Sequence, residues 1–226
     1  MRNNSNKIWS LLLASTLIGC SVNPPIIENM QRSGTENSPY YEAFGGRITS
    51  KAKYIEKYEL NASEKYNDTN SLTEEYGVFV NTSRRFKYFA VGTGITNLTP
   101  YLHVSGYIPN IASISPYAVL NYKGSIKVLP GVIASVTPLK YFGFKSALYL
   151  EYNSTDTEPC GTFLGPCGLM TIGPFKIIDY GIFANLPIES ESADKALSVN
   201  IGVKRQIETS LSSIYVQVSY QAFSQH

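Results

Sequence analysis

Residues 214–222 read Ile-Tyr-Val-Gln-Val-Ser-Tyr-Gln-Ala, so that Ile214, Val216 and Val218 alternate with Tyr215, Gln217 and Ser219. A period of two is the signature of a β-strand, because successive side chains of a strand point to opposite faces. The same period recurs over residues 199–204, 142–151 and 120–128. Val, Ile, Tyr and Phe dominate these runs, as strand surfaces favour. From Tyr76 onward the chain is therefore predicted to be β-structured.

Prolines divide the alternating runs, at positions 109, 116, 130, 138, 174 and 187. Because proline is disfavoured in the interior of a strand, we take these positions as strand boundaries. Counted in this way, the sequence contains about eight strands and no long amphipathic helix. We expect an all-β fold of about eight antiparallel strands in a barrel or a sandwich.

Two orientations of the strands fit the alternation. In a soluble barrel or sandwich the apolar faces point inward. In a transmembrane barrel they point to lipid, and the polar faces line the interior. An eight-stranded barrel would be filled by side chains or would hold one small ligand.

The N-terminus carries an export signal. Arg2 and Lys7 precede an apolar run over residues 8–18, which is shorter than a membrane-spanning helix. The run ends in Leu17-Ile18-Gly19-Cys20, which resembles the lipobox of bacterial lipoproteins. That resemblance implies cleavage before Cys20 and attachment of acyl chains to it. Ser21, in place of an Asp, implies sorting to the outer membrane of a Gram-negative envelope.

These features divide the chain into a signal peptide over residues 1–19, a lipidated tether over 20–39 and a β domain over 40–226. The tether contains Pro24, Pro25, Gly34 and several Ser and Asn residues, which suit a linker.

The composition excludes several classes of protein. The chain has 226 residues, of which 43% are apolar and 16% charged, so a disordered acidic or basic protein is not expected. The sequence contains no internal run of about 18 apolar residues, so it does not predict a helical membrane span. The net charge of +2 is carried by the signal peptide, since removing Arg2 and Lys7 leaves 19 − 2 = 17 basic residues against 17 acidic ones. We expect no nucleic-acid partner.

Two cysteines remain in the β domain. Cys160 and Cys167 flank Gly-Thr-Phe-Leu-Gly-Pro, and export places them where disulfides persist. We predict a disulfide between them that orders a loop. A zinc site would need more ligands, and the chain has only His103 and His226 in addition. No metal or other cofactor is expected.

The middle of the chain is free of acidic residues from Glu75 to Glu151. Seven cations lie between them: Arg84, Arg85, Lys87, Lys123, Lys127, Lys140 and Lys145. A segregated positive field can recruit anions even when the total charge is zero. Candidate partners are lipopolysaccharide, phospholipid or another envelope protein. Alternatively, neighbouring strands mix these charges with acidic ones.

One arrangement suggests chemistry. His103 and Ser105 are two residues apart, so in a strand they share a face. A His-x-Ser pair on a barrel strand resembles the lipid A deacylase family of outer-membrane barrels. Those enzymes also use a Glu shortly downstream, whereas the next carboxylate here is Glu151. Asp179, in an apolar run, is expected to line a lumen or the surface rather than act as a catalytic acid.

The sequence therefore favours an outer-membrane-anchored lipoprotein with a non-enzymatic binding, scaffolding or assembly role. Two alternatives remain: a carrier of lipid or another small apolar ligand in a barrel cavity, and a lipid-modifying enzyme that uses His103 and Ser105.

Overall fold

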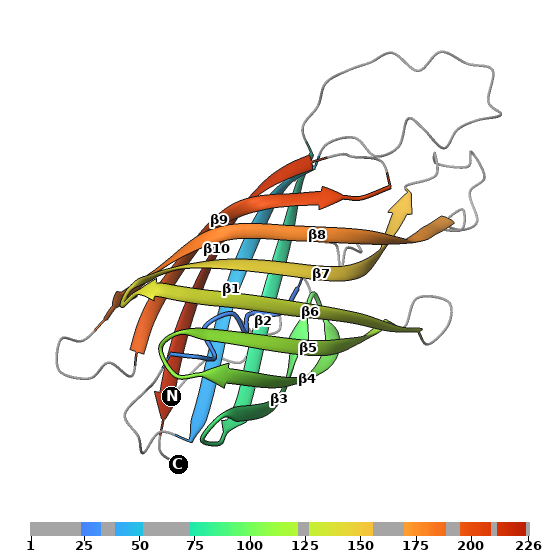
Figure 1. Ribbon diagram of the computed structural model, residues 1–226. Helices are drawn as coiled ribbons and strands as arrows, with labels where there is room; N and C mark the ends of the chain where they lie inside the picture. Colours follow the sequence, from blue (N-terminus) through green and yellow to red (C-terminus); the bar gives the residue numbers. More distant parts are fainter. Residues whose placement is uncertain are drawn as a thin grey trace, which may run out of the picture.

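Ten antiparallel strands form a closed barrel in the computed structural model, which describes residues 24–32, 39–51, 73–121, 127–155, 170–188, 195–208 and 212–224. The strands are β1 (Tyr40–Lys51), β2 (Thr73–Arg85), β3 (Phe89–Thr96), β4 (Thr99–Ile108), β5 (Ala112–Asn121), β6 (Lys127–Leu139), β7 (Phe142–Thr155), β8 (Met170–Pro187), β9 (Lys195–Gln206) and β10 (Ser212–Ser224). Each strand pairs with its sequence neighbours, and β1 closes the barrel against β10 (Figure 1).

The predicted barrel is confirmed, but it has ten strands rather than about eight. Pro116 of β5 and Pro130 of β6 lie inside paired strands, opposite Val132 and Ala118. The prediction that these two prolines mark strand boundaries was therefore wrong. A proline removes one hydrogen bond from the ladder, but the pairing of the strands continues on both sides of it. The first strand, β1, falls in a stretch whose charges and glycines conceal the alternation.

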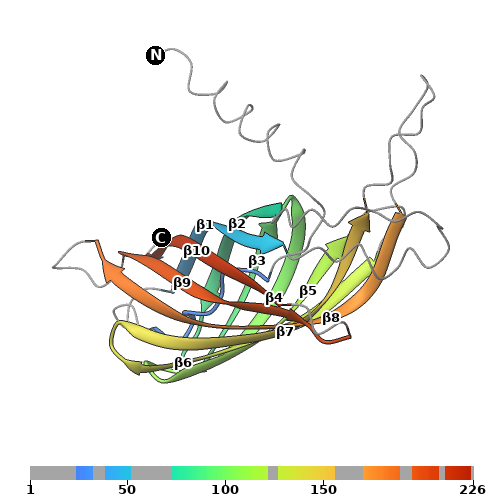
Figure 2. The same cartoon turned by 90° about the horizontal axis from the view of Figure 1, so that it is seen from above.

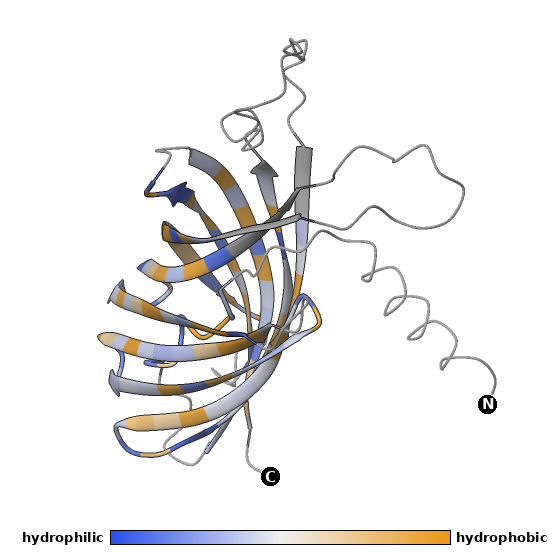
Figure 3. Cartoon of the chain, turned by 90° about the vertical axis from the view of Figure 1, so that its right-hand side faces the viewer, coloured by the Kyte–Doolittle hydropathy of each residue, from blue (hydrophilic) through white to orange (hydrophobic). Residues whose placement is uncertain are grey.

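The barrel is apolar outside, and its inward faces carry a mixture of polar, charged, aromatic and apolar side chains. On β4, Leu102, Val104 and Ile108 are 63%, 51% and 59% exposed, whereas His103 and Ser105 between them are buried. On β10 the outward residues are Ile214, Val216 and Val218, and the inward ones include Gln217, Ser219 and Gln221. Hydrophobic and hydrophilic bands accordingly alternate along the strands (Figure 3). Of the two orientations considered, the structure has the one with outward apolar faces.

The two ends of the barrel differ in the length of their connections. At one end the strands are joined by residues 86–88, 109–111, 140–141 and 188–194. We call this the short-turn end; Tyr40 and Ser224 lie here too, paired with each other. The opposite end has the two longest connections, residues 52–72 and 156–169, and we call it the long-connection end. In the part of the chain that the structure describes, no helix is long and apolar enough to cross a membrane.

Residues 24–32 lie within the barrel rather than along its wall. Residues 24–31 are buried, and the segment is enclosed by the strands in two perpendicular views (Figure 2). We call residues 24–32 the plug. The prediction of a tether over residues 20–39 is corrected accordingly. Residues 24–31 of this stretch are packed inside the barrel, because their side chains contact the barrel wall there.

Candidate functional site

The lumen is lined by side chains that carry charge and hydrogen-bonding groups. Arg47 of β1 reaches across to Asp179 of β8, with 2.6 Å between Nη1 and Oδ2, and both side chains are fully buried. The Arg47 guanidinium also lies 3.6 Å from the ring centroid of Tyr215. A second buried pair joins Lys204 of β9 to Glu151 of β7 at 2.8 Å. Buried charges need such partners, since an unpaired one is costly. Asp179 therefore lies in the lumen, which is one of the two locations predicted for it.

The polar side chains of the plug bind the barrel wall on several sides. Asn29 Nδ2 donates to Asn185 Oδ1 of β8 and to Gln221 Oε1 of β10, each at 2.9 Å. Gln31 Nε2 donates to Thr137 Oγ1 at 2.6 Å, and Gln31 Oε1 accepts from Ser113 at 2.8 Å. The plug is thus tied to at least four strands by two of its side chains.

Glu28 supplies the negative charge of the plug. Its Oε1 accepts a 2.7 Å hydrogen bond from Gln217 Nε2 and lies 3.7 Å from Lys145 Nζ. Lys145 also donates to Gln217 Oε1 at 3.2 Å. Glu28 therefore balances a lysine that the wall turns inward, although its second oxygen, Oε2, has no hydrogen-bond partner among the described residues.

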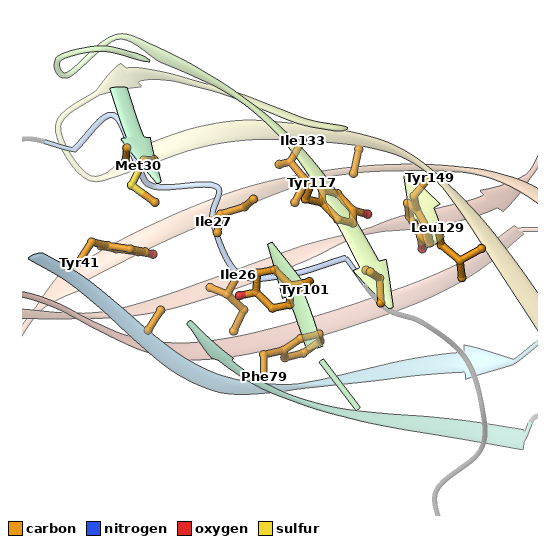
Figure 4. Packing of buried hydrophobic residues seen from close by; sticks show 14 of the residues in the cluster. Ile26, Ile27, Met30, Tyr41, Phe79, Tyr101, Tyr117, Leu129, Ile133 and Tyr149 are labelled. Carbon is orange, nitrogen blue, oxygen red and sulfur yellow. The ribbon is translucent and has the colours of Figure 1, made fainter. Parts of the chain in front are cut away.

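The apolar side chains of the plug pack against inward-facing residues of the wall. Ile26, Ile27 and Met30 are fully buried among wall residues that include Tyr41 and Tyr101 (Figure 4). Burying a side chain of this size contributes about 1.5–3 kcal/mol. The plug is therefore held both by hydrogen bonds and by apolar contacts.

The C-terminal end of the plug lies at the short-turn end. The Asn110 amide donates to the Gln31 carbonyl oxygen at 2.8 Å, and Arg85 Nη2 donates to the Arg32 carbonyl oxygen at 2.9 Å. Arg32 stacks over Phe223 at 5.9 Å. The plug thus reaches the short-turn end with its C-terminal residues, Gln31 and Arg32.

His103 and Ser105 do meet inside the barrel. His103 Nδ1 lies 3.0 Å from Ser105 Oγ, and Nε2 lies 2.9 Å from Ser83 Oγ, which also accepts from Asn81. The predicted shared face is confirmed. In the described residues no carboxylate is hydrogen-bonded to His103, whose two nitrogens both face serines. A catalytic triad needs a carboxylate that orients the histidine. Without one, His103 and the serines form a buried polar cluster rather than a complete triad.

Two glycines make room for the inward side chains of β4. A methyl group on Gly92 would overlap His103 Nε2 and Ser83 Oγ, and one on Gly94 would overlap the Tyr101 hydroxyl. Gly92 and Gly94 of β3 therefore lie where the neighbouring side chains approach the backbone closely.

The acid-free middle does not form one basic face. Lys145 is a correction: it is buried and paired with Glu28, so it cannot meet an external anion. Arg85 points partly inward onto the plug. Arg84, Lys87 and Lys140 lie at the short-turn end, and Lys127 lies at the opposite one, where β6 begins. Their role toward an anionic partner stays a prediction.

Several predicted residues lie outside the described part of the chain. These are Cys20, Cys160, Cys167 and Lys123. No group of metal-binding side chains occurs among the described residues.

Sequence reasoning missed the plug and the ion pairs of the lumen. The plug had no signal beyond unusual apolar residues, Ile26, Ile27 and Met30, in a presumed linker. Lys145 and Lys204 could have been found, because each stands at an inward position of an alternating strand, whereas Arg47 lies in β1, where the alternation is concealed.

Comparison with known proteins gives no match to this chain among family models, curated proteins or solved structures.

Proposed function

We propose that this protein is a lipidated, membrane-spanning β-barrel of the bacterial outer membrane, with its lumen closed by its own N-terminal segment and a non-enzymatic binding, scaffolding or assembly role. The observation that carries the proposal is the reversed polarity of the wall. A ring of exposed Leu, Val, Ile and Phe side chains is costly in water and favourable in lipid.

The connections support the same reading. Bacterial outer-membrane barrels have short periplasmic turns and longer external loops. This barrel has the same asymmetry, with both termini of the wall at its short-turn end.

Aromatic and cationic side chains at the short-turn end suit a headgroup interface. Arg84 lies over Phe86 at 5.6 Å, Lys87 over Tyr88 at 5.1 Å, and Lys140 over Tyr141 at 5.1 Å from the ring centroids. All three rings are exposed. Aromatic belts mark membrane interfaces, and lysine or arginine beside them would meet lipid phosphates. These cations are thus assigned to phospholipid headgroups rather than to a soluble anion.

The two alternative functions have weaker support. A carrier of apolar ligands needs a free apolar cavity, whereas the inward faces of this barrel mix polar and apolar side chains, and the plug packs among them. A hydrolase needs an oriented and accessible His103–Ser105 pair, and both residues are buried among neutral partners.

The proposal is tested by fractionating cells that express the full chain or the Cys20→Ala variant. We expect radiolabelled palmitate on the wild type only. We expect the variant to resist extraction with alkaline carbonate to the same extent as the wild type, because the strands hold it in the bilayer. Release of the unlipidated variant as a soluble protein would contradict the membrane-spanning barrel, and palmitate on the variant would contradict lipidation of Cys20.

A further inference from the structure

The described wall of the barrel carries one more buried cation than buried carboxylates. Its buried charges are those of Arg47, Lys145 and Lys204 on one side of the balance and of Glu151 and Asp179 on the other. Arg47 is paired with Asp179 at 2.6 Å, and Lys204 is paired with Glu151 at 2.8 Å. The charge left over is that of Lys145, and the carboxylate that faces it comes from the plug.

Two glycines allow Lys145 to approach Tyr215 across the wall. Lys145 of β7 pairs with Gly181 of β8, Gly181 pairs with Gly202 of β9, and Gly202 pairs with Tyr215 of β10 (Figure 1). A methyl group on either glycine would overlap the Tyr215 hydroxyl. The Tyr215 ring therefore lies close to the backbone of β8 and β9, and Lys145 Nζ comes within 5.3 Å of its centroid.

Gln217 and Lys145 direct their donors at the same carboxylate oxygen. Lys145 Nζ donates to Gln217 Oε1 at 3.2 Å, and Gln217 Nε2 donates to Glu28 Oε1 at 2.7 Å. The acceptor and the donors of an amide are on different atoms, so the bond from Lys145 turns Nε2 toward Glu28. Lys145 Nζ itself lies 3.7 Å from Glu28 Oε1. An ammonium and an amide thus converge on one point.

The converging groups are held by the wall and not by the plug. Gln217 of β10 is paired with Arg47 on one neighbouring strand and with Asn200 on the other. Lys145 of β7 is paired with Ser135 of β6 as well as with β8. Because these ladders do not include residues 24–32, the strands alone fix the backbone positions of both side chains.

We propose that Lys145 and Gln217, beside Tyr215, form a carboxylate-binding site of the wall, whose resident ligand is Glu28 of the plug. A small free carboxylate binds there when the Glu28 side chain is removed. The donor set suits this class of ligand, because a carboxylate only accepts hydrogen bonds and the site offers an ammonium and an amide N–H. The inference goes beyond the proposed function and depends neither on lipidation nor on insertion into a membrane.

The test is chemical rescue of the Glu28→Ala variant of the full chain. The substitution removes a methylene and a carboxylate beyond Cβ, which together match acetate in size. Urea unfolding of the purified barrel in detergent micelles is measured with added acetate or acetamide, at constant pH and ionic strength. Acetamide has the shape of acetate without its charge, so it reports any effect of size alone.

We expect acetate to raise the unfolding midpoint of Glu28→Ala in a saturable manner and acetamide to leave it unchanged. By mass action, acetate at about ten times its dissociation constant lowers the unfolding equilibrium constant about eleven-fold. The wild type, whose site is filled by Glu28, should not respond, and neither should Glu28→Ala/Lys145→Met, which lacks the ammonium. If Glu28→Ala does not fold in buffer alone, its refolding yield in acetate and in acetamide gives the same comparison.

Three outcomes would overturn the inference. Equal effects of acetate and acetamide on Glu28→Ala would show that the site does not recognise the charge. A response of the wild type or of Glu28→Ala/Lys145→Met as large as that of Glu28→Ala would place the anion elsewhere on the protein. The absence of any response of Glu28→Ala to acetate would show that Lys145 and Gln217 do not bind a carboxylate apart from the plug.

Discussion

The side-chain amide of Gln217 donates a 2.7 Å hydrogen bond to Glu28 Oε1 and so joins the wall of the barrel to the segment that fills it. The same carboxylate faces Lys145 at 3.7 Å. Glu28 is therefore the point at which the plug meets the charge of the lumen, and it is the most direct place to test how the plug is held.

The Glu28→Gln substitution removes the charge but keeps the shape of this contact. We expect it to lower the free energy of unfolding by about 1–3 kcal/mol, because Lys145 would lose its buried counter-charge. The measurement is urea unfolding of the folded barrel in lipid vesicles. The double variant Glu28→Gln/Lys145→Gln should recover part of the loss, and equal stability of wild type and single variant would contradict this account of the plug.

The Arg47–Asp179 pair is expected to be the costliest contact of the lumen to break. Arg47→Met leaves Asp179 buried without its partner and should destabilise the barrel by about 3–5 kcal/mol. Arg47→Met/Asp179→Leu removes both charges and should be closer to the wild type in the same unfolding assay. A double variant that is less stable than the single one would show that Asp179 does not depend on Arg47.

The close approach around Gly92 gives a matched pair of substitutions. Gly92→Ala would place a methyl group against Ser83 and His103, so we expect a loss of about 1–3 kcal/mol. Gly106→Ala on the neighbouring strand meets only Ile114 Cγ2 at 4.0 Å and should be tolerated. Comparable melting of the two variants would contradict the described packing of His103.

A charge on the outer face distinguishes lipid from water. Ile201 is 49% exposed in the middle of β9, so in water Ile201→Arg would be neutral. In a bilayer it should cost about 2–4 kcal/mol, because arginine would face the hydrocarbon core. Leu139→Arg, at the end of β6, should cost at most about 1 kcal/mol. Equal stability of both variants in vesicles would argue against a spanning barrel.

The alternation of residues 214–222 and of the similar runs was sufficient to predict strands in a barrel or a sandwich, but it could not say which face is inside. Ile214 and Val216 would suit a core as well as a lipid surface, since a period of two is the same in both cases. The inward faces held the better clue, because Arg47 and Asp179 are tolerable as buried charges only where they pair across a lumen.

The site was harder to predict than the fold, because its contacts join residues far apart in the sequence. Asn29 and Gln221 are separated by 192 positions, and nothing local to either indicates the other. His103 and Ser105 could be paired from spacing alone, yet their neighbour Ser83 comes from another strand. Pro24 and Pro25 indicated a linker, because their burial depends on the surrounding barrel, which the local sequence does not show.

The measurement that tests the central claim most directly uses a spin label on the stretch that indicated the fold. Val218→Cys, with Cys160 and Cys167 replaced by Ser, places the label on the outward face of β10; Lys140→Cys in the same background places it at a turn. In lipid vesicles, a spanning barrel predicts that oxygen relaxes the Val218 label strongly and a water-soluble nickel chelate hardly does, with the reverse at Lys140. A Val218 label that the nickel chelate reaches as readily as the Lys140 label would contradict the account.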